Sequence, residues 1–472
     1  MYKFILHNVE KAHQYEELIK VFLKPEEFIV ALEIPDENCS NTVSFVASKN
    51  YDCEGTTFES TFTGDKDELK KEIYLFLREK TGKIPPWGII TGIRPVKLFG
   101  EIAKDNGVDK TEEIFLDKYC VSPEKARLAA SIYQYQQSEI GESERNAVGV
   151  YIGIPFCPTR CLYCSFTSNQ VKDSEMEKYV DALIHEIRES AKYMRENNIY
   201  AETIYIGGGT PTTLSEELLE KLLCVVNEEL LTEKLREFTV EAGRPDTITE
   251  GKLRVIKEAG AKRISINPQT MHDKTLKVIG RDHTSENIEK AFAVAKKVET
   301  ESINCDLIAG LPGETLEDFR YSMDKILQMA PENITVHTLA VKRSSRLKDK
   351  DKDYHYKHGE IATSMLNLSY EILKEKGYKP YYLYRQKHMA GAGENVGFCL
   401  PGHEGIYNAR IMDEHQSILA FGAGGISKVY FPEEDRLERV PNVSNYSIYI
   451  ERIDEMIERK KKNFFEEENN VN

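Results

Sequence analysis

Between residues 148 and 341, short apolar runs alternate with longer amphipathic segments, and this alternation constrains the fold more than any other feature. Six apolar runs have the length of β-strands, namely 149–154, 203–206, 237–241, 263–267, 303–308 and 334–340. The segments between them have helical periodicity and cover 174–197, 215–230, 249–259, 285–298 and 316–329. Strands that alternate with helices pair in parallel through right-handed crossovers. The pattern predicts an α/β fold with a partial (β/α)6 barrel, whose functional groups lie at the carboxyl ends of the strands.

The sequence on either side of this alternation has a different pattern. Before it, we expect strands over 27–34, 42–47 and 56–63, and helices over 66–80, 110–118 and 123–139. After it come a long helix, a Gly-rich loop over 390–405, a strand over 418–420 and a helix that ends near 462. The sequence therefore predicts an N-terminal α/β accessory domain (1–145), the barrel (146–345) and a C-terminal α+β extension that covers the substrate (346–472).

The bulk composition excludes several classes of protein. The chain has 472 residues and a formal net charge of -15, so general affinity for nucleic acid is not expected. No apolar run reaches the roughly 18 residues of a membrane span, and the first residues are too soon polar for a secretory signal. We expect a cytoplasmic monomer. The nine cysteines, three of them crowded together, indicate a metal site rather than a disulfide framework.

The crowded cysteines are Cys157, Cys161 and Cys164, which follow the first barrel strand with CxxxCxxC spacing. Three thiolates on one loop can hold three irons of a [4Fe–4S] cluster. The fourth iron is then open to chelate the amino and carboxylate groups of S-adenosylmethionine. Structural zinc prefers four ligands, and no fourth Cys or His lies nearby.

Other polar or glycine-rich segments follow the next strands. Gly207 to Pro211 comes directly after the second strand, where exposed backbone amides can meet a carboxylate. Glu241 ends the third strand and suits ribose hydroxyls. Gln269 follows the fourth strand. Asp306 lies inside the apolar fifth strand and needs a partner, for which Arg281 is the candidate, either in a ligand site or in a structural ion pair at the barrel rim.

With these motifs, residues 148–341 resemble the oxygen-independent coproporphyrinogen III oxidase group of the radical S-adenosylmethionine superfamily. The flanking segments 85–95, 384–391, 394–397 and 401–405 resemble the coproporphyrinogen dehydrogenase branch of Gram-positive bacteria. The resemblance implies two bound S-adenosylmethionine molecules and catalytic roles for Tyr151 and Glu241. It implies cofactor contacts at Tyr151, Tyr163, Gly208, Gly209, Thr210, Glu241, Gln269, Arg281, Asp306 and Ala340.

The chemistry implied by the resemblance is oxidative decarboxylation of two substrate propionates to vinyl groups, which gives protoporphyrinogen IX. A reductant such as flavodoxin or ferredoxin would supply the electron. The tetrapyrrole substrate carries four carboxylates, so cations are expected near the barrel mouth. The candidates are Arg343, Arg346, Arg385 and Lys387.

One residue departs from the pattern of the best-studied branch, which has a further Cys two positions after the third ligand. This chain has Ser165-Phe166 there. Relatives that act as heme chaperones also lack that Cys. The sequence therefore leaves two alternatives open, a heme chaperone and a radical methylase or heme-degrading enzyme.

Overall fold

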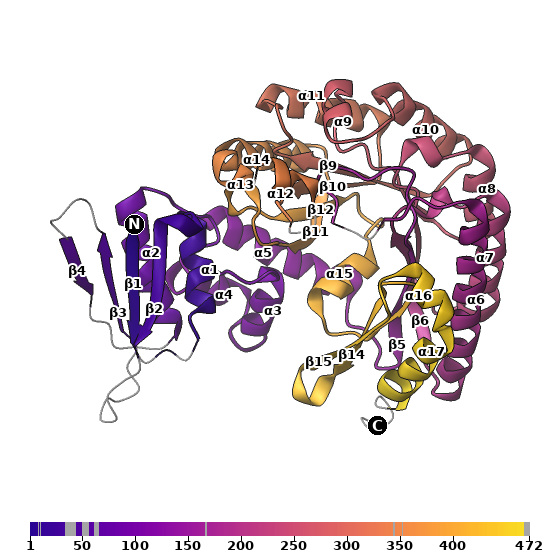
Figure 1. Ribbon diagram of the computed structural model, residues 1–472, viewed down its shortest axis with the longest axis horizontal. Coiled ribbons are helices and arrows are strands. Elements are labelled where there is room, and N and C mark those ends of the chain that lie inside the picture. Colours follow the sequence, from indigo (N-terminus) through magenta and orange to yellow (C-terminus); the bar gives the residue numbers. More distant parts are fainter. Residues whose placement is uncertain are drawn as a thin grey trace.

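An eleven-stranded mixed sheet forms the centre of the molecule, with strand order β11-β12-β10-β9-β8-β7-β6-β5-β13-β14-β15 (Figure 1). The computed structural model describes residues 1–7, 9, 11–33, 44–49, 56–60, 66–165, 168–342, 345–351 and 353–466. The six middle strands are parallel: β5 (Ala147–Ile154), β6 (Tyr200–Gly208), β7 (Glu237–Glu241), β8 (Arg263–Ser265), β9 (Ser302–Ala309) and β10 (Asn333–Thr338). The predicted partial (β/α)6 barrel is thus confirmed.

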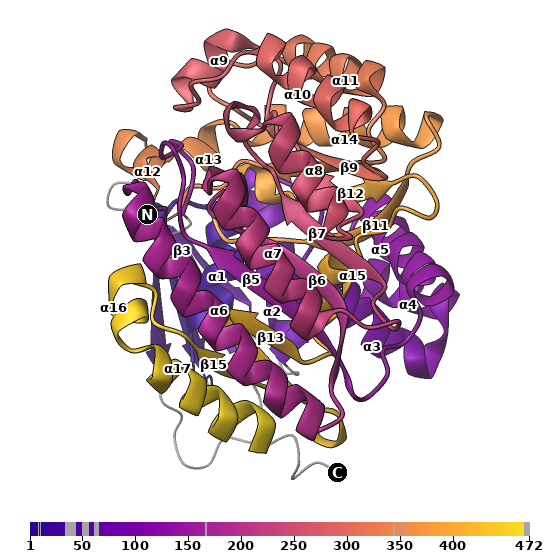
Figure 2. The ribbon, with the colours of Figure 1, turned by 90° about the vertical axis from the view of Figure 1, so that its right-hand side faces the viewer.

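Helices cover the outer face of these strands, and Figure 2 shows α6, α7 and α8 lying beside one another there. The barrel helices are α6 (Asp173–Glu196), α7 (Glu216–Leu230), α8 (Glu250–Glu258), α9 (Asp273–Val278), α10 (Ser285–Lys297) and α11 (Leu316–Met329). Side-chain caps fix several starts, as where the Thr315 hydroxyl accepts from the Asp318 backbone N–H while the Asp318 carboxylate accepts from Thr315. Each helix buries its apolar face against the strands, so strand ends and loops are held in register.

The C-terminal stretch extends the sheet at both edges instead of forming a separate layer. Strands β11 (Lys379–Tyr384) and β12 (Asn395–Cys399) join beyond β10, while β13 (Ile418–Phe421), β14 (Ile426–Phe431) and β15 (Arg436–Pro441) join beyond β5. The helices of this stretch are α12 (Arg346–Lys350), α13 (Tyr354–Lys357), α14 (Gly359–Glu375), α15 (Ile406–Asp413), α16 (Tyr446–Glu451) and α17 (Ile453–Lys460).

Helix α15 closes the barrel at the amino ends of the strands. Just before it, the carbonyl of His403 accepts from Arg263 at the start of β8 and from Asn333 at the start of β10. Within it, the backbone N–H of Tyr407 donates to Glu237 at the start of β7 over 2.8 Å. The opposite end of the barrel, where the strands finish, carries the predicted site.

A small four-stranded sheet, order β2-β1-β3-β4, forms the N-terminal unit together with two helices (Figure 1). Its elements are β1 (Tyr2–His7), α1 (His13–Phe22), β2 (Phe28–Glu33), β3 (Ser44–Lys49), β4 (Thr56–Ser60) and α2 (Lys66–Thr81). The sequence pattern missed β1 and α1. Residues 34, 42–43 and 61–63 of the predicted strands lie outside the described residues.

The hydrophobic cores divide the chain near residue 87, whereas the predicted domain boundary is at 145. One core joins residues between Tyr2 and Ile89, and a second, larger core begins at Trp87 and includes the barrel. Helices α3 (Pro95–Asn106), α4 (Val108–Asp117) and α5 (Pro123–Tyr135) belong to the larger core. Helix α5 packs against β11, so this helical stretch covers one edge of the open sheet. Among the described residues no helix is both long and apolar enough to cross a membrane.

A buried polar network fastens this helical stretch to the C-terminal segment. The Glu394 carboxylate accepts hydrogen bonds from Trp87, over 2.7 Å, and from Lys125 and Tyr370. Although burial raises the pKa of Glu394, the charge of Lys125 and the three hydrogen bonds lower it below its ordinary value. The segment around residue 87, which the sequence singled out, therefore has a structural role at this junction.

Candidate active site

In four barrel strands a single residue remains half-buried while the rest of the strand is buried. These residues are Tyr151 in β5, Glu241 in β7, Asp306 in β9 and His337 in β10. Tyr205 of β6 is also half-buried and pairs in register with Tyr151. A polar side chain that keeps some exposure in an otherwise buried strand faces an internal opening, so these five outline a cavity near the carboxyl ends.

The cysteine loop follows β5 and lies against the glycine-rich turn after β6. Cys157 Sγ is 3.4 Å from Thr210 Oγ1, and the backbone N–H of Cys164 donates to the Cys161 carbonyl over 3.3 Å. Burial raises the pKa of Cys157 to about 11, with smaller upward contributions from the charges of Cys164 and Cys161. The three thiols are therefore electrostatic neighbours, and iron binding would deprotonate them.

The donor set fits an iron–sulfur cubane better than a single metal ion. All three thiols are free of disulfides. In the described part of the chain, no three His, Cys, Asp or Glu side chains converge as the ligands of one ion do. Thiolates of a cubane each bind a separate iron and do not converge on one point.

Glycines are required where this loop meets the turn after β6. A Cβ on Gly209 would lie 2.5 Å from the Phe156 carbonyl oxygen and 3.0 Å from Cys157 Sγ. Gly208 has φ +108°, and a Cβ on Gly207 would lie 3.0 Å from the Glu241 carboxyl group. The turn therefore brings bare backbone between the cysteine loop and Glu241, as the predicted contact with S-adenosylmethionine requires.

Glu241 is the most perturbed carboxyl group of the cavity. Burial raises its pKa to about 7, and the negative charge of Asp306 adds to the increase. The Tyr205 hydroxyl donates to Glu241 Oε1 over 2.5 Å, and this hydrogen bond lowers the pKa of Glu241, against the effect of burial. A carboxyl group poised near neutrality in a cavity is typical of a functional site.

Three stacked tyrosines lie beneath this carboxyl group. Tyr205 stacks on Tyr407 at a centroid distance of 4.7 Å, and Tyr151 stacks with each at 6.4 Å. Sequence reasoning missed Tyr205, Tyr407 and also His337. The position of Tyr205 two residues before the glycine turn could have revealed it, whereas nothing in the sequence relates Tyr407, from α15, to the barrel.

Asp306 takes a partner other than the one expected. His337 Nε2 lies 3.4 Å from Asp306 Oδ2, and Asn304 donates to Oδ1 over 2.8 Å. Despite burial, these contacts lower the pKa of Asp306 below its ordinary value. Among the described residues, no ion pair joins Asp306 to Arg281, because His337 of the neighbouring strand takes that position, although the charge of Arg281 also helps to lower the pKa of Asp306.

Arg281 instead connects the loop after β8 to the cysteine loop. It donates to the Asn267 carbonyl over 2.8 Å and to the Tyr163 hydroxyl over 3.1 Å, while its Nε is buried without a partner. Gln269 has φ +69°, and its backbone N–H donates to the Asp306 carbonyl over 2.9 Å. Both residues are thus placed around the cavity, in keeping with the predicted ligand contacts.

The remaining predicted residues divide between the site and the domain junction. Ala340 forms an isolated bridge with Met389. Arg385 is buried and donates to backbone carbonyls, including that of Ala392 over 3.0 Å, so its guanidinium is engaged within the protein. Lys387 pairs with Glu17 of α1 over 3.0 Å.

The other two predicted substrate cations are Arg343 and Arg346. Arg346 is exposed at the start of α12, whereas Arg343 lies outside the described residues.

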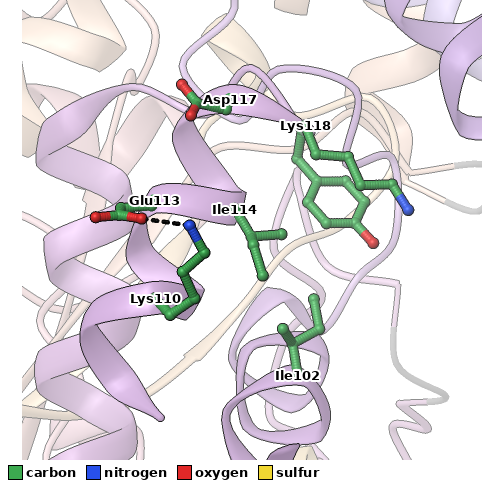
Figure 3. A pocket seen from close by; sticks show the side chains of 7 residues that line it. Ile102, Lys110, Glu113, Ile114, Asp117 and Lys118 are labelled. Atoms are coloured by element: carbon green, nitrogen blue, oxygen red, sulfur yellow. Dashed lines mark hydrogen bonds and ion pairs between the residues drawn. The ribbon is translucent and has the colours of Figure 1, made fainter. Parts of the chain in front are cut away.

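A surface pocket of about 310 Å³ lies elsewhere, between α3 and α4. Figure 3 shows its lining, where Lys110 donates to Glu113 over 2.6 Å. None of the predicted site residues lines it, and its charges are solvated, so it contributes nothing to the chemistry of the cysteine loop.

Comparison with known proteins agrees with this geometry. The Radical SAM superfamily model matches residues 151–326. The oxygen-independent coproporphyrinogen-III oxidase-like protein HemZ of Bacillus subtilis is 36% identical over 455 residues, which cover 93% of this chain and 90% of that protein. The heme chaperone HemW of the same organism is 34% identical and covers 58% of this chain and 69% of its own length. The structure of coproporphyrinogen III oxidase HemN from Escherichia coli has a TM-score of 0.53 at 20% identity, covering 66% of this chain and 70% of that one.

The chain belongs to the radical S-adenosylmethionine superfamily. Within it, the chain falls in the oxygen-independent coproporphyrinogen III oxidase group, with the HemZ protein as a relative along nearly its whole length. Membership of the superfamily implies a [4Fe–4S] cluster and S-adenosylmethionine as cofactors. The likeness to HemN shows that the open α/β barrel is the fold of this group.

Proposed function

We propose that this protein is an oxygen-independent coproporphyrinogen III dehydrogenase, which converts two propionates of the substrate to vinyl groups and yields protoporphyrinogen IX. The observation that carries the proposal is the 93% coverage of the chain by similarity to the coproporphyrinogen-III oxidase-like HemZ protein, against 58% for the heme chaperone.

When bound, the reduced cluster and S-adenosylmethionine would supply the radical chemistry that removes a hydrogen from the β-carbon of a propionate. The residues of this chain bind and orient. Cys157, Cys161 and Cys164 hold the cluster, and the glycine turn at 207–209 offers backbone amides to the methionine end of the cofactor. Glu241 accepts from ribose hydroxyls in its ionised form.

We infer that the cavity binds two S-adenosylmethionine molecules, one on each side. One side is lined by Tyr151, the glycine turn and Glu241. The other is lined by Gln269, Arg281 and Asp306, where the orphaned Nε of Arg281 and the orphaned Oδ1 of Asn267 await partners. We assign the second molecule to that side, and Arg346 to the substrate carboxylates.

The test is an anaerobic assay of the reconstituted protein with reductant, S-adenosylmethionine and coproporphyrinogen III. We expect protoporphyrin, after oxidation, together with 5′-deoxyadenosine. Neither should form with Cys161→Ala, while Cys224→Ala, which changes an exposed thiol on α7, should retain both. Deoxyadenosine without protoporphyrin would refute the assigned substrate while keeping the radical chemistry.

A heme chaperone is the second candidate, and Ser165 favours it, because the chaperone relatives share the absence of a fourth Cys in the motif. The same preparation distinguishes the two. Stoichiometric heme binding with a shifted Soret band, in the absence of porphyrinogen turnover, would favour the chaperone.

A further inference from the structure

Two short helices are attached directly to the cysteine loop through one residue. The backbone N–H of Leu162 donates to the Ile279 carbonyl over 2.8 Å, at the end of α9. Its carbonyl accepts from the Leu347 N–H over 3.1 Å, at the start of α12. Leu162 lies between Cys161 and Cys164, so both helices are fixed beside the cluster ligands. Figure 2 shows α9 and α12 at the same end of the barrel as the start of α6, which follows the cysteine loop.

The exposed faces of these helices are basic, although the whole chain has a net charge of -15. Helix α9 exposes two lysines and α12 exposes three cations, namely Lys274, Lys277, Arg346, Lys348 and Lys350.

Within the described residues, no ion pair engages Lys277, Lys348 or Lys350, so these charges are available to a partner. The acidic residues on the two helices are fewer. Asp273 is already committed to the Ser285 N–H over 2.7 Å, which leaves Asp349.

An exposed apolar side chain ends α9, directly after Lys277. Val278 is 45% exposed, and it directly precedes Ile279, whose carbonyl holds the cysteine loop. Transient protein interfaces combine an apolar centre with a charged rim, and the rim charges steer association and set its salt dependence. The basic patch, defined as Lys277, Val278, Lys348 and Lys350, has this composition.

We propose that the basic patch is the docking surface for an acidic one-electron carrier protein that reduces the cluster. The inference rests on the proposed radical function, because that chemistry needs an electron from outside the chain. One electron leaves the carrier's reduced flavin or iron–sulfur centre and enters the cluster, and no bond forms or breaks in this step. Charge complementarity favours an acidic partner at this patch, because the chain as a whole has a net charge of -15.

The test compares two triple variants of equal charge change in the reconstituted holoenzyme. Lys277→Glu, Lys348→Glu and Lys350→Glu together reverse the patch. Lys104→Glu, Lys296→Glu and Lys374→Glu together reverse exposed lysines on α3, α10 and α14. Reduced flavodoxin is the probe, and stopped-flow absorbance follows cluster reduction without any porphyrinogen, so failure of the assigned substrate does not affect the result.

We expect the patch variant to be reduced by flavodoxin at least tenfold more slowly at low salt and to bind oxidised flavodoxin correspondingly more weakly in a fluorescence titration. Reduction by dithionite should be unchanged, and the control variant should match the native protein. Equal rates in all three proteins, or an equal loss with dithionite, would overturn the assignment. Native reduction by flavodoxin that is insensitive to salt would overturn it as well.

Discussion

The bond between Tyr205 and Glu241 should set the pH range in which S-adenosylmethionine binds. Tyr205→Phe removes a hydroxyl that donates to the carboxylate over 2.5 Å and keeps the ring that stacks on Tyr407. The groups that face Glu241 are this hydroxyl, the Gly208 N–H and the charge of Asp306, with the rings of Tyr151 and Tyr407 behind them. The substitution therefore changes one hydrogen bond in a fixed environment.

The size of the effect follows from the kind of hydrogen bond. A hydrogen bond to a charged group contributes about 1.5–3 kcal/mol. Since one pKa unit corresponds to about 1.4 kcal/mol, its loss should raise the pKa of Glu241 by about one to two units. Burial already raises that pKa to about 7, so the variant should have a midpoint near 8 to 9.

The assay is the dissociation constant for S-adenosylmethionine across the neutral to alkaline range, measured by anaerobic calorimetry on the reconstituted protein. Ribose hydroxyls donate best to an ionised carboxylate, so native affinity should fall as the pH drops through the pKa of Glu241. In Tyr205→Phe that fall should begin one to two pH units higher. Tyr407→Phe is the matched control, because no hydrogen bond joins its hydroxyl to Glu241. An unchanged midpoint in Tyr205→Phe would refute the reasoning.

Three further predictions concern stability and assembly. Glu241→Gln should raise the melting temperature at pH 8. Burial raises the pKa of Glu241 to about 7, so keeping the carboxylate ionised above that pH costs the folded state about 3 kcal/mol. Calorimetry should find no gain below about pH 4.5, where the carboxyl group is neutral in both states. Lys125→Met should lower the unfolding free energy in urea by about 3–5 kcal/mol at neutral pH by leaving the Glu394 carboxylate buried and unpaired, and a loss below 1 kcal/mol would contradict that account. Gly209→Ala should impair cluster assembly, measured as bound iron and sulfide, because its Cβ would lie 2.5 Å from a carbonyl oxygen, whereas Gly92→Ala, with open space around it, should assemble normally.

The barrel could be predicted from the sequence because its strands are buried on both faces and its helices are amphipathic. The predicted range 316–329 coincides with α11, and 237–241 coincides with β7. Of the edge strands, the sequence pattern predicts only β13, as a strand over 418–420. Its pairing with β5 could not be predicted, because the two strands lie far apart in the sequence. Such pairings depend on which strand edges remain unpaired in the folded core, and a local sequence pattern does not contain that information.

The same distinction separates the site residues that motifs revealed from those that they did not. A motif marks a residue whose neighbours in sequence are also its neighbours in the site. Cys157 and Gly209 each belong to such a motif, and the two motifs meet because they follow adjacent strands. Arg385 lies in a motif, and yet its guanidinium donates to backbone carbonyls at the domain junction. A guanidinium has five donors, so it can join irregular segments as readily as it can bind a carboxylate. Tyr407 has no motif and yet stacks under the cavity, because α15 lies far along the chain from the barrel strands whose ends it contacts. A polar residue that stays half-buried in a buried strand is therefore a more direct mark of the cavity than a charged motif, and this property exists only once the strands are paired.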